Sequence, residues 1–197
     1  MPSAALQRWS GDRATNLAEL LVAHRQLGAP GTGRRYATRQ LNFALILRLA
    51  SEFQGFARDL HDEAAIVMGE WSHPTDRRLA QVISSGLTAG RQLGRANPKP
   101  ETLAADFGRF GMQLWPALQG RDRRTSARRS QLKALNAARN ALAHDDAAQL
   151  ATLQGGSQRL DLSSFKVWRG AVGGLATTMD VVVSDYLSQL FGRPAPW

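Results

Sequence analysis

The stretch that decides the fold runs from Tyr36 to Gly69 and reads YATRQLNFALILRLASEFQGFARDLHDEAAIVMG. Apolar side chains recur in it every three or four residues, the period that places them on one face of an α-helix. The members of this row are Leu41, Leu45, Leu49, Phe53, Phe56, Leu60, Ala64 and Val67. The charged residues lie mostly off the row, so the sequence predicts a long amphipathic helix over residues 36–69.

Five further segments repeat the same period. We expect helices over residues 14–27, 77–95, 103–118, 125–150 and 163–191, separated by glycine and proline breaks. The chain has only 8 Val and 3 Ile against 30 Ala and 26 Leu, a composition that argues against a sheet. The predicted fold class is therefore all-α, an antiparallel up-and-down helical bundle of three long helices plus shorter helices.

The 197 residues suit one domain with a sizeable core. We expect an N-terminal helix and Gly/Pro loop over residues 1–35, packed on a bundle over 36–191, and a flexible tail over 192–197. The absence of cysteine excludes disulfides, thiolate metal sites and a cysteine nucleophile. No apolar run reaches the roughly 20 residues of a membrane span and no signal-peptide pattern opens the chain, so we expect a cytoplasmic protein without a membrane partner.

The chain is strongly basic, with 25 Lys+Arg against 16 Asp+Glu and a net charge of +9. Of these basic residues 22 are arginines, whose forked side chains fit phosphate oxygens. A nucleic-acid partner and a coding bias toward arginine explain this composition equally well. Six basic residues open the 125–150 helix or the turn before it: Arg121, Arg123, Arg124, Arg128, Arg129 and Lys133. We expect them to hold RNA phosphates without reading bases, with a solvated charged face as the alternative.

The glycine-rich segment from Gly28 to Arg35 is similar to the phosphate loop of nucleotide triphosphatases. Its glycines are correctly spaced, but Arg34 stands where Lys contacts the phosphates and Arg35 where Ser or Thr holds magnesium. An amphipathic helix also precedes it, where that motif requires a buried strand. An ordinary helix-breaking loop is therefore favoured over ATP binding.

Arg139, Asn140 and His144 form the group that carries a chemical signal. Asn140 and His144 are i, i+4 neighbours on one helix face, so their side chains can hydrogen-bond, and Arg139 flanks that face. The remaining histidines have no comparable neighbours; we interpret them as a core or boundary, a helix-surface and a loop residue, respectively: His24, His61 and His73.

The pattern Arg139-Asn140-x-x-x-His144 resembles the Arg-x4-6-His signature of the HEPN superfamily. The order of helices is closest to the RiboL-PSP-HEPN branch, in which the motif lies near the end of the third long helix and a long helix closes the domain. The run Ala50-Ser51-Glu52-Phe53 is similar to part of that branch's first helix. Asp146 stands where a related branch has a tyrosine that its antitoxin modifies, so the resemblance does not imply that regulation.

Members of this superfamily are helical bundles, usually dimeric, and many resemble metal-independent endoribonucleases of toxin–antitoxin or antiviral defence systems. The resemblance implies RNA as substrate, a homodimer, an antitoxin or regulatory protein as a further partner, and no metal or cofactor. Arg139, His144 and Asn140 would be catalytic, and Glu52 would support them unless it is a plain surface glutamate. A non-catalytic bundle that binds nucleic acid or a protein, and a chance match to the motif, are the alternatives.

RNA carries its own nucleophile, the 2′-OH, so its cleavage needs a proton acceptor, a proton donor and positive charge near the phosphate. Histidine titrates near neutral pH and arginine is a permanent bidentate cation. One histidine can hardly serve as acid and base in the same step. A two-fold dimer that brings two Arg139/His144 pairs to one cleft would supply both.

Overall fold

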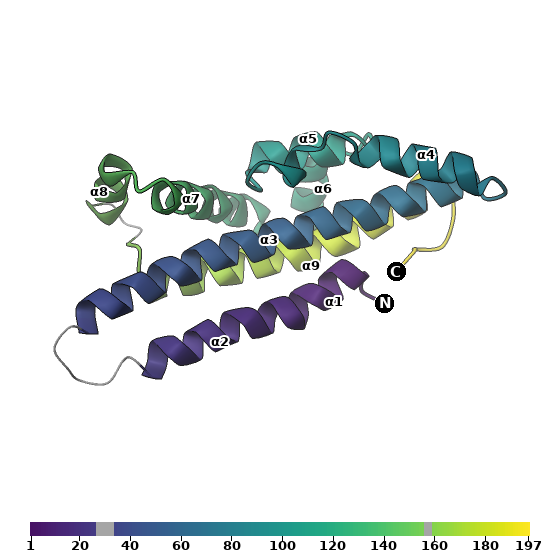
Figure 1. Cartoon of the computed structure of the whole chain (residues 1–197). Helices are drawn as coiled ribbons and strands as arrows, with labels where there is room; N and C mark the ends of the chain where they lie inside the picture. Colours follow the sequence, from purple (N-terminus) through teal and green to yellow (C-terminus); the bar gives the residue numbers. More distant parts are fainter. Residues whose placement is uncertain (27–33, 156–158) are drawn as a thin grey trace.

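Helix α3 (Arg34–Ser72) is the longest element of the computed structural model, which describes residues 1–26, 34–155 and 159–197. It contains the whole of the predicted 36–69 helix. The apolar row from Leu45 to Ala64 is buried, with Phe53 and Phe56 fully enclosed. These side chains pack α3 against helices on both of its sides, and the long periodic stretch therefore forms the centre of the molecule (Figure 1).

The helices lie in layers about α3 (Figure 1). Helix α9 (Leu162–Phe191) runs alongside α3, and the two contact each other along their length. On one side of this pair lie α1 (Ala4–Ser10) and α2 (Asp12–Gln26). On the other side lie α4 (Arg77–Thr88), a 3-10 turn η1 (Gln92–Gly94), α5 (Pro100–Gly108), α6 (Leu114–Arg121), α7 (Thr125–Ala143) and α8 (Ala147–Gly155).

Helix α7 spans from α9 to α3. Near its start Arg128 donates to the Thr178 hydroxyl of α9 over 3.5 Å, whereas near its end Arg139 shares a groove with Arg48 of α3. Helices are the only regular elements in the described ranges, so the all-α class is confirmed. The antiparallel up-and-down order is not confirmed, since α7 bridges the two long helices rather than running beside them as a third member.

Three predicted helices are each divided in the structure. The 77–95 segment contains α4 and the 3-10 turn η1, with Gly90 at φ +69° between them. The 103–118 segment contains parts of α5 and α6, which are separated at Gly111, a residue with φ +79°. The 125–150 segment contains α7 and most of α8, separated at Asp145 with φ +47°, a left-handed conformation that aspartate tolerates better than most residues. Helix α1 was not predicted; the Ser3 hydroxyl caps it by accepting from the backbone N–H of Leu6 over 3.0 Å.

His61 is buried at the centre of the molecule, so its interpretation as a helix-surface residue is wrong. Its ring lies 4.4 Å from the ring of Phe110 between centroids, and its Nε2 lies 3.1 Å from the carbonyl oxygen of Asp106. Burial lowers the pKa of His61 because the protonated ring would be poorly solvated there.

The two ends of the chain lie close together beside α9 (Figure 1). The indole N–H of Trp197 donates to the carbonyl oxygen of Asp180 over 3.2 Å, and Ser184 donates to the carbonyl oxygen of Trp197. The segment 192–197, expected to be flexible, therefore lies against α9.

No helix within the described residues combines the length and hydropathy needed to cross a bilayer. The phosphate-loop lookalike over 28–33 falls outside the described residues.

Candidate functional site

The predicted catalytic residues lie at the end of α7. Arg139 and Asn140 are half-buried within the helix, whereas His144 is exposed and forms its C-cap, with φ −107° and ψ 3°. The backbone N–H of His144 still donates to the carbonyl oxygen of Asn140 over 3.1 Å. Across the described residues, no hydrogen bond or ion pair occupies the His144 imidazole, so the expected bond between Asn140 and His144 is not formed. The ring is open to a ligand instead.

Asn140 is held by a residue that the sequence did not single out. The side-chain amide of Asn97 donates to the Asn140 Oδ1, and the Nη1 of Arg139 approaches the same oxygen at 3.4 Å. Asn97 lies in the loop between η1 and α5, and this loop is fixed by Gln54, which donates to the Ala96 carbonyl oxygen over 2.9 Å. The only sequence signal for Asn97 was its place in an Asn-Pro-Lys-Pro break.

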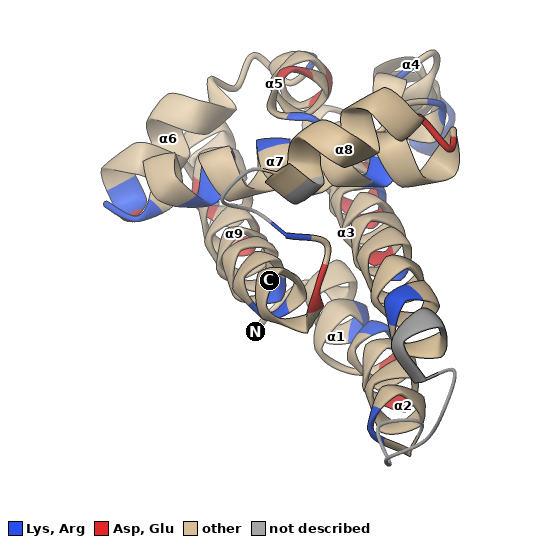
Figure 2. Cartoon of the chain, turned by 90° about the vertical axis from the view of Figure 1, so that its left-hand side faces the viewer, with Lys and Arg blue, Asp and Glu red and all other residues tan. Residues whose placement is uncertain are grey.

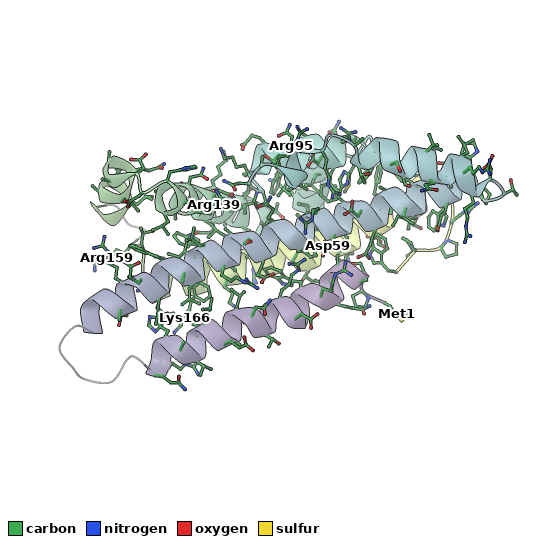
Figure 3. All side chains as sticks on the ribbon, in the orientation of Figure 1. Met1, Asp59, Arg95, Arg139, Arg159 and Lys166 are labelled. Atoms are coloured by element: carbon green, nitrogen blue, oxygen red, sulfur yellow. The ribbon has the colours of Figure 1, made fainter. Side chains whose placement is uncertain are left out.

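A groove of about 450 Å³ opens beside this helix end. Figure 3 shows Arg139, which lines it, where α7 meets α3. Its lining comes from three helices and comprises Leu20, Ala44, Leu47, Arg48, Ser51, Gln54, Arg139 and Ala143. His144 follows directly after the last of these residues, so the groove adjoins the candidate catalytic group.

Glu52 is buried below Arg48 rather than exposed as a plain surface glutamate. Its carboxylate accepts from Arg13 at 2.8 Å and from Asn16 at 3.0 Å, and it pairs with Arg48 at 2.6 Å. Burial alone would raise the pKa of Glu52, but the hydrogen bonds from Arg13 and Asn16 and the Arg48 charge together hold that pKa below its ordinary value. Glu52 is therefore ionised, and it does not itself line the groove.

Three of the six predicted RNA-binding residues are engaged by other parts of the chain. Arg128 pairs with the carboxylate of Asp122 and packs so closely over Gly174 that a Cβ there would overlap the guanidinium. The Arg129 guanidinium lies 4.8 Å from the centre of the Trp115 ring. The ammonium of Lys133 lies 3.7 Å from the Glu101 carboxylate, with both side chains mostly exposed.

The other three, Arg121, Arg123 and Arg124, are exposed at the turn from α6 into α7. Figure 2 shows this turn as a basic end of the molecule. Within the described residues, none of the three makes an ion pair. The 15 residue steps from Arg124 to Arg139 span about 22 Å of helix, so only an extended ligand could contact both ends of α7.

One acidic side chain at the junction of α7 and α8 has a structural role. Asp146, which follows the candidate group, caps α8 by accepting from the backbone N–H of Gln149 over 3.0 Å. Within the residues that the structure describes, three or more His, Asp or Glu side chains nowhere converge as a metal site would require.

Comparison of the chain with models of protein families, with curated proteins and with solved structures finds no match.

Proposed function

We propose that the protein is a metal-independent endoribonuclease of the HEPN type that acts as a toxin or phage-defence effector. The observation that carries the proposal is the exposed His144 imidazole, which follows an Arg139 guanidinium without a carboxylate partner in the described part of the chain. An unpaired guanidinium and an accessible imidazole at one helix end are the groups that phosphate cleavage requires. The antiparallel up-and-down bundle of that superfamily belongs to the same proposal.

RNA cleavage by this mechanism needs two copies of the Arg139/His144 pair. In a two-fold dimer that brings the ends of two α7 helices together, one His144 takes the proton of the 2′-OH, whose oxygen then attacks the adjacent phosphorus. The bond from phosphorus to the 5′ oxygen breaks, and the second copy of His144 protonates that oxygen. The products are a 2′,3′-cyclic phosphate and a free 5′-OH. Arg139 stabilises the charge that gathers on the phosphoryl oxygens.

Cleavage is tested by incubating the purified protein with RNA in excess EDTA. We expect cleavage by the native protein and by His73→Ala, the control for a histidine outside the group, but none by His144→Ala or Arg139→Ala. Expression in cells should arrest growth, and His144→Ala should relieve that arrest. Cleavage that survives both active-group substitutions would refute the assignment of these residues.

The dimer is tested by cross-linking, because the native chain has no cysteine to interfere. A single cysteine at Ala143, the exposed last residue of α7, should be joined to its copy by a short bis-maleimide. A single cysteine at Ser126, near the other end of α7, should not. Equal cross-linking at both positions, or none at Ala143, would contradict a composite site.

One observation favours a second function, a non-catalytic bundle that binds nucleic acid. Arg121, Arg123 and Arg124 are exposed together and make no ion pair within the described residues, which leaves their charges available to backbone phosphates. This alternative predicts salt-sensitive binding of RNA or DNA without cleavage. Neutralising the three arginines should abolish that binding, and His144→Ala should leave it unchanged.

A further inference from the structure

The groove beside α7 lies in a region with more guanidinium groups than carboxylates. On its α3 side the single carboxylate of Glu52 is shared by two arginines, Arg48 at 2.6 Å and Arg13 at 2.8 Å. Arg139 adds a further positive charge, with no carboxylate within ion-pair distance in the described ranges. A half-buried cation without a carboxylate partner is costly, so an anion bound here would be stabilised.

Arg48 is placed to face such an anion. Its guanidinium is held from below by Glu52 at 2.6 Å, yet its side chain is still 46% exposed. Because Glu52 is already shared with Arg13 at 2.8 Å, it does not fully neutralise Arg48. Arg48 and Arg139 thus bring two guanidiniums from different helices to one groove. Such forked donors match the oxygen pairs of a phosphate.

The rest of the groove is largely apolar. Leu20, Ala44, Leu47 and Ala143 contribute hydrocarbon surface, with the short polar side chain of Ser51 beside them. The volume of about 450 Å³ lies in the range of small-ligand sites, about 300 to 1,000 Å³. A groove that combines two cations with an apolar surface suits a ligand that combines a phosphate with a flat ring.

We infer that this groove binds one nucleotide of single-stranded RNA, with its phosphate at Arg48 and Arg139 and its base against Leu20 and Leu47. Single-stranded RNA is the substrate class because a base can enter the groove only when it is neither paired nor stacked. The inference rests on the proposed function for the identity of the ligand as RNA. It adds Arg48 as a substrate-binding residue, and Glu52 as the residue that positions it.

The test measures binding of a short fluorescent single-stranded oligoribonucleotide by anisotropy, in a His144→Ala background that cannot cleave it. Arg48→Ala should raise the Kd about tenfold and lower the slope of log Kd against log salt by about one. Arg58→Ala is the matched control, since Arg58 lies on the same helix and is also 46% exposed but lies outside the groove. It should leave the Kd unchanged.

A second variant avoids any loss of the Arg48–Glu52 pair. Ser51→Glu adds a carboxylate to the groove at an exposed helical position and should weaken binding at least as much, whereas Ser51→Gln should not. A duplex of the same sequence should bind with an affinity that neither Arg48→Ala nor Ser51→Glu changes. Equal Kd values for the Arg48→Ala and Arg58→Ala variants, or equal effects on duplex and single strand, would overturn the inference.

The experiments distinguish a failure of the groove assignment from a failure of the proposed endoribonuclease function. If the native protein cleaves RNA and Arg48→Ala leaves kcat/KM unchanged, the groove assignment is wrong and the endoribonuclease stands. If the native protein does not cleave RNA but Arg48→Ala still weakens single-strand binding, the groove assignment stands and the endoribonuclease is wrong.

Discussion

Replacing Glu52 by alanine should loosen α2 from the rest of the molecule. Helix α2 contributes one fully buried apolar residue, Leu17, with Leu20 and Leu21 partly buried against the core, so polar contacts add to a limited apolar attachment. The carboxylate of Glu52 is the main one, since it bonds Arg13 and Asn16 of α2 at 2.8 and 3.0 Å.

The size of the effect follows from the burial of the partners. Removing one member of a buried ion pair costs about 3–5 kcal/mol, because the other charge stays behind without a partner. Arg13 keeps its 2.7 Å pair with Asp59, and Arg48 is half-exposed, so we expect a smaller loss. We predict a loss of about 2–3 kcal/mol in the free energy of unfolding. For a chain of this length that lowers the Tm by about 4–12 °C.

Urea unfolding gives the free energy, and hydrogen exchange locates the loss. Exchange should accelerate most in α2, less in α3 and least in α9. Glu70→Ala, an exposed position on the same helix, is the control and should change neither quantity. Glu52→Gln keeps a hydrogen-bond acceptor and should lose less stability than Glu52→Ala. An alanine variant as stable as the control, or with faster exchange spread evenly over all helices, would refute this reasoning.

Three further perturbations follow from the packing. Gly69→Ala should destabilise the protein by about 1–3 kcal/mol, since its Cβ would lie within 3.0 Å of the Ala80 carbonyl oxygen, whereas Gly170→Ala, in open space on α9, should stabilise it by about 0.5–1 kcal/mol in urea unfolding. Because the pKa of His61 is lowered, the unfolded chain binds more protons than the native one, so stability should fall as pH drops from about 6.5 toward that lowered pKa, by at most about 1.4 kcal/mol per pH unit. His61→Phe should reduce that slope, and an unchanged slope in its unfolding curves would contradict the assignment. Asn97→Ala should lower the kcat of RNA cleavage by about two- to tenfold with KM unchanged, because it frees the motif asparagine, and a change in KM alone would contradict this role.

The central helices were predictable because their periods are long and regular. The row on α3 and the predicted row from Phe165 to Val182 on α9 both describe buried faces in the structure, whereas Leu190, the last member predicted on α9, is exposed. Breaks set by one residue were not predictable. Asp145 divides α7 from α8 by adopting a left-handed conformation, which the surrounding sequence, without glycine or proline, does not signal.

The surroundings of single polar residues depend on distant parts of the chain. Glu52 lies off the apolar row of α3, and its burial follows from Arg13, whose position on a separate helix no local pattern reveals. His61 is followed by two acidic residues and therefore resembled a surface run, but successive residues of a helix point about 100° apart, and only His61 faces the core.

The basic turn also shows that sequence spacing does not reveal which partners a charged side chain contacts. Sequence spacing grouped six cations, yet Arg129 stacks on Trp115 and Arg128 packs over Gly174, partners that lie on other helices. The candidate catalytic group was predictable as a motif at the end of a helix. The groove beside it was not, because Arg48 and Arg139 are far apart in the chain.

The most direct test asks whether the 2′-OH of the RNA itself is the attacking group. It compares one oligoribonucleotide with a copy that carries a single 2′-deoxy sugar at the main cleavage position. The rate of cutting at that position is measured in excess EDTA for the native protein. The proposed chemistry predicts a 2′,3′-cyclic phosphate end from the all-ribose strand and no cutting at the deoxy position. Equal rates on the two strands would contradict it, because the attacking oxygen would then come from elsewhere.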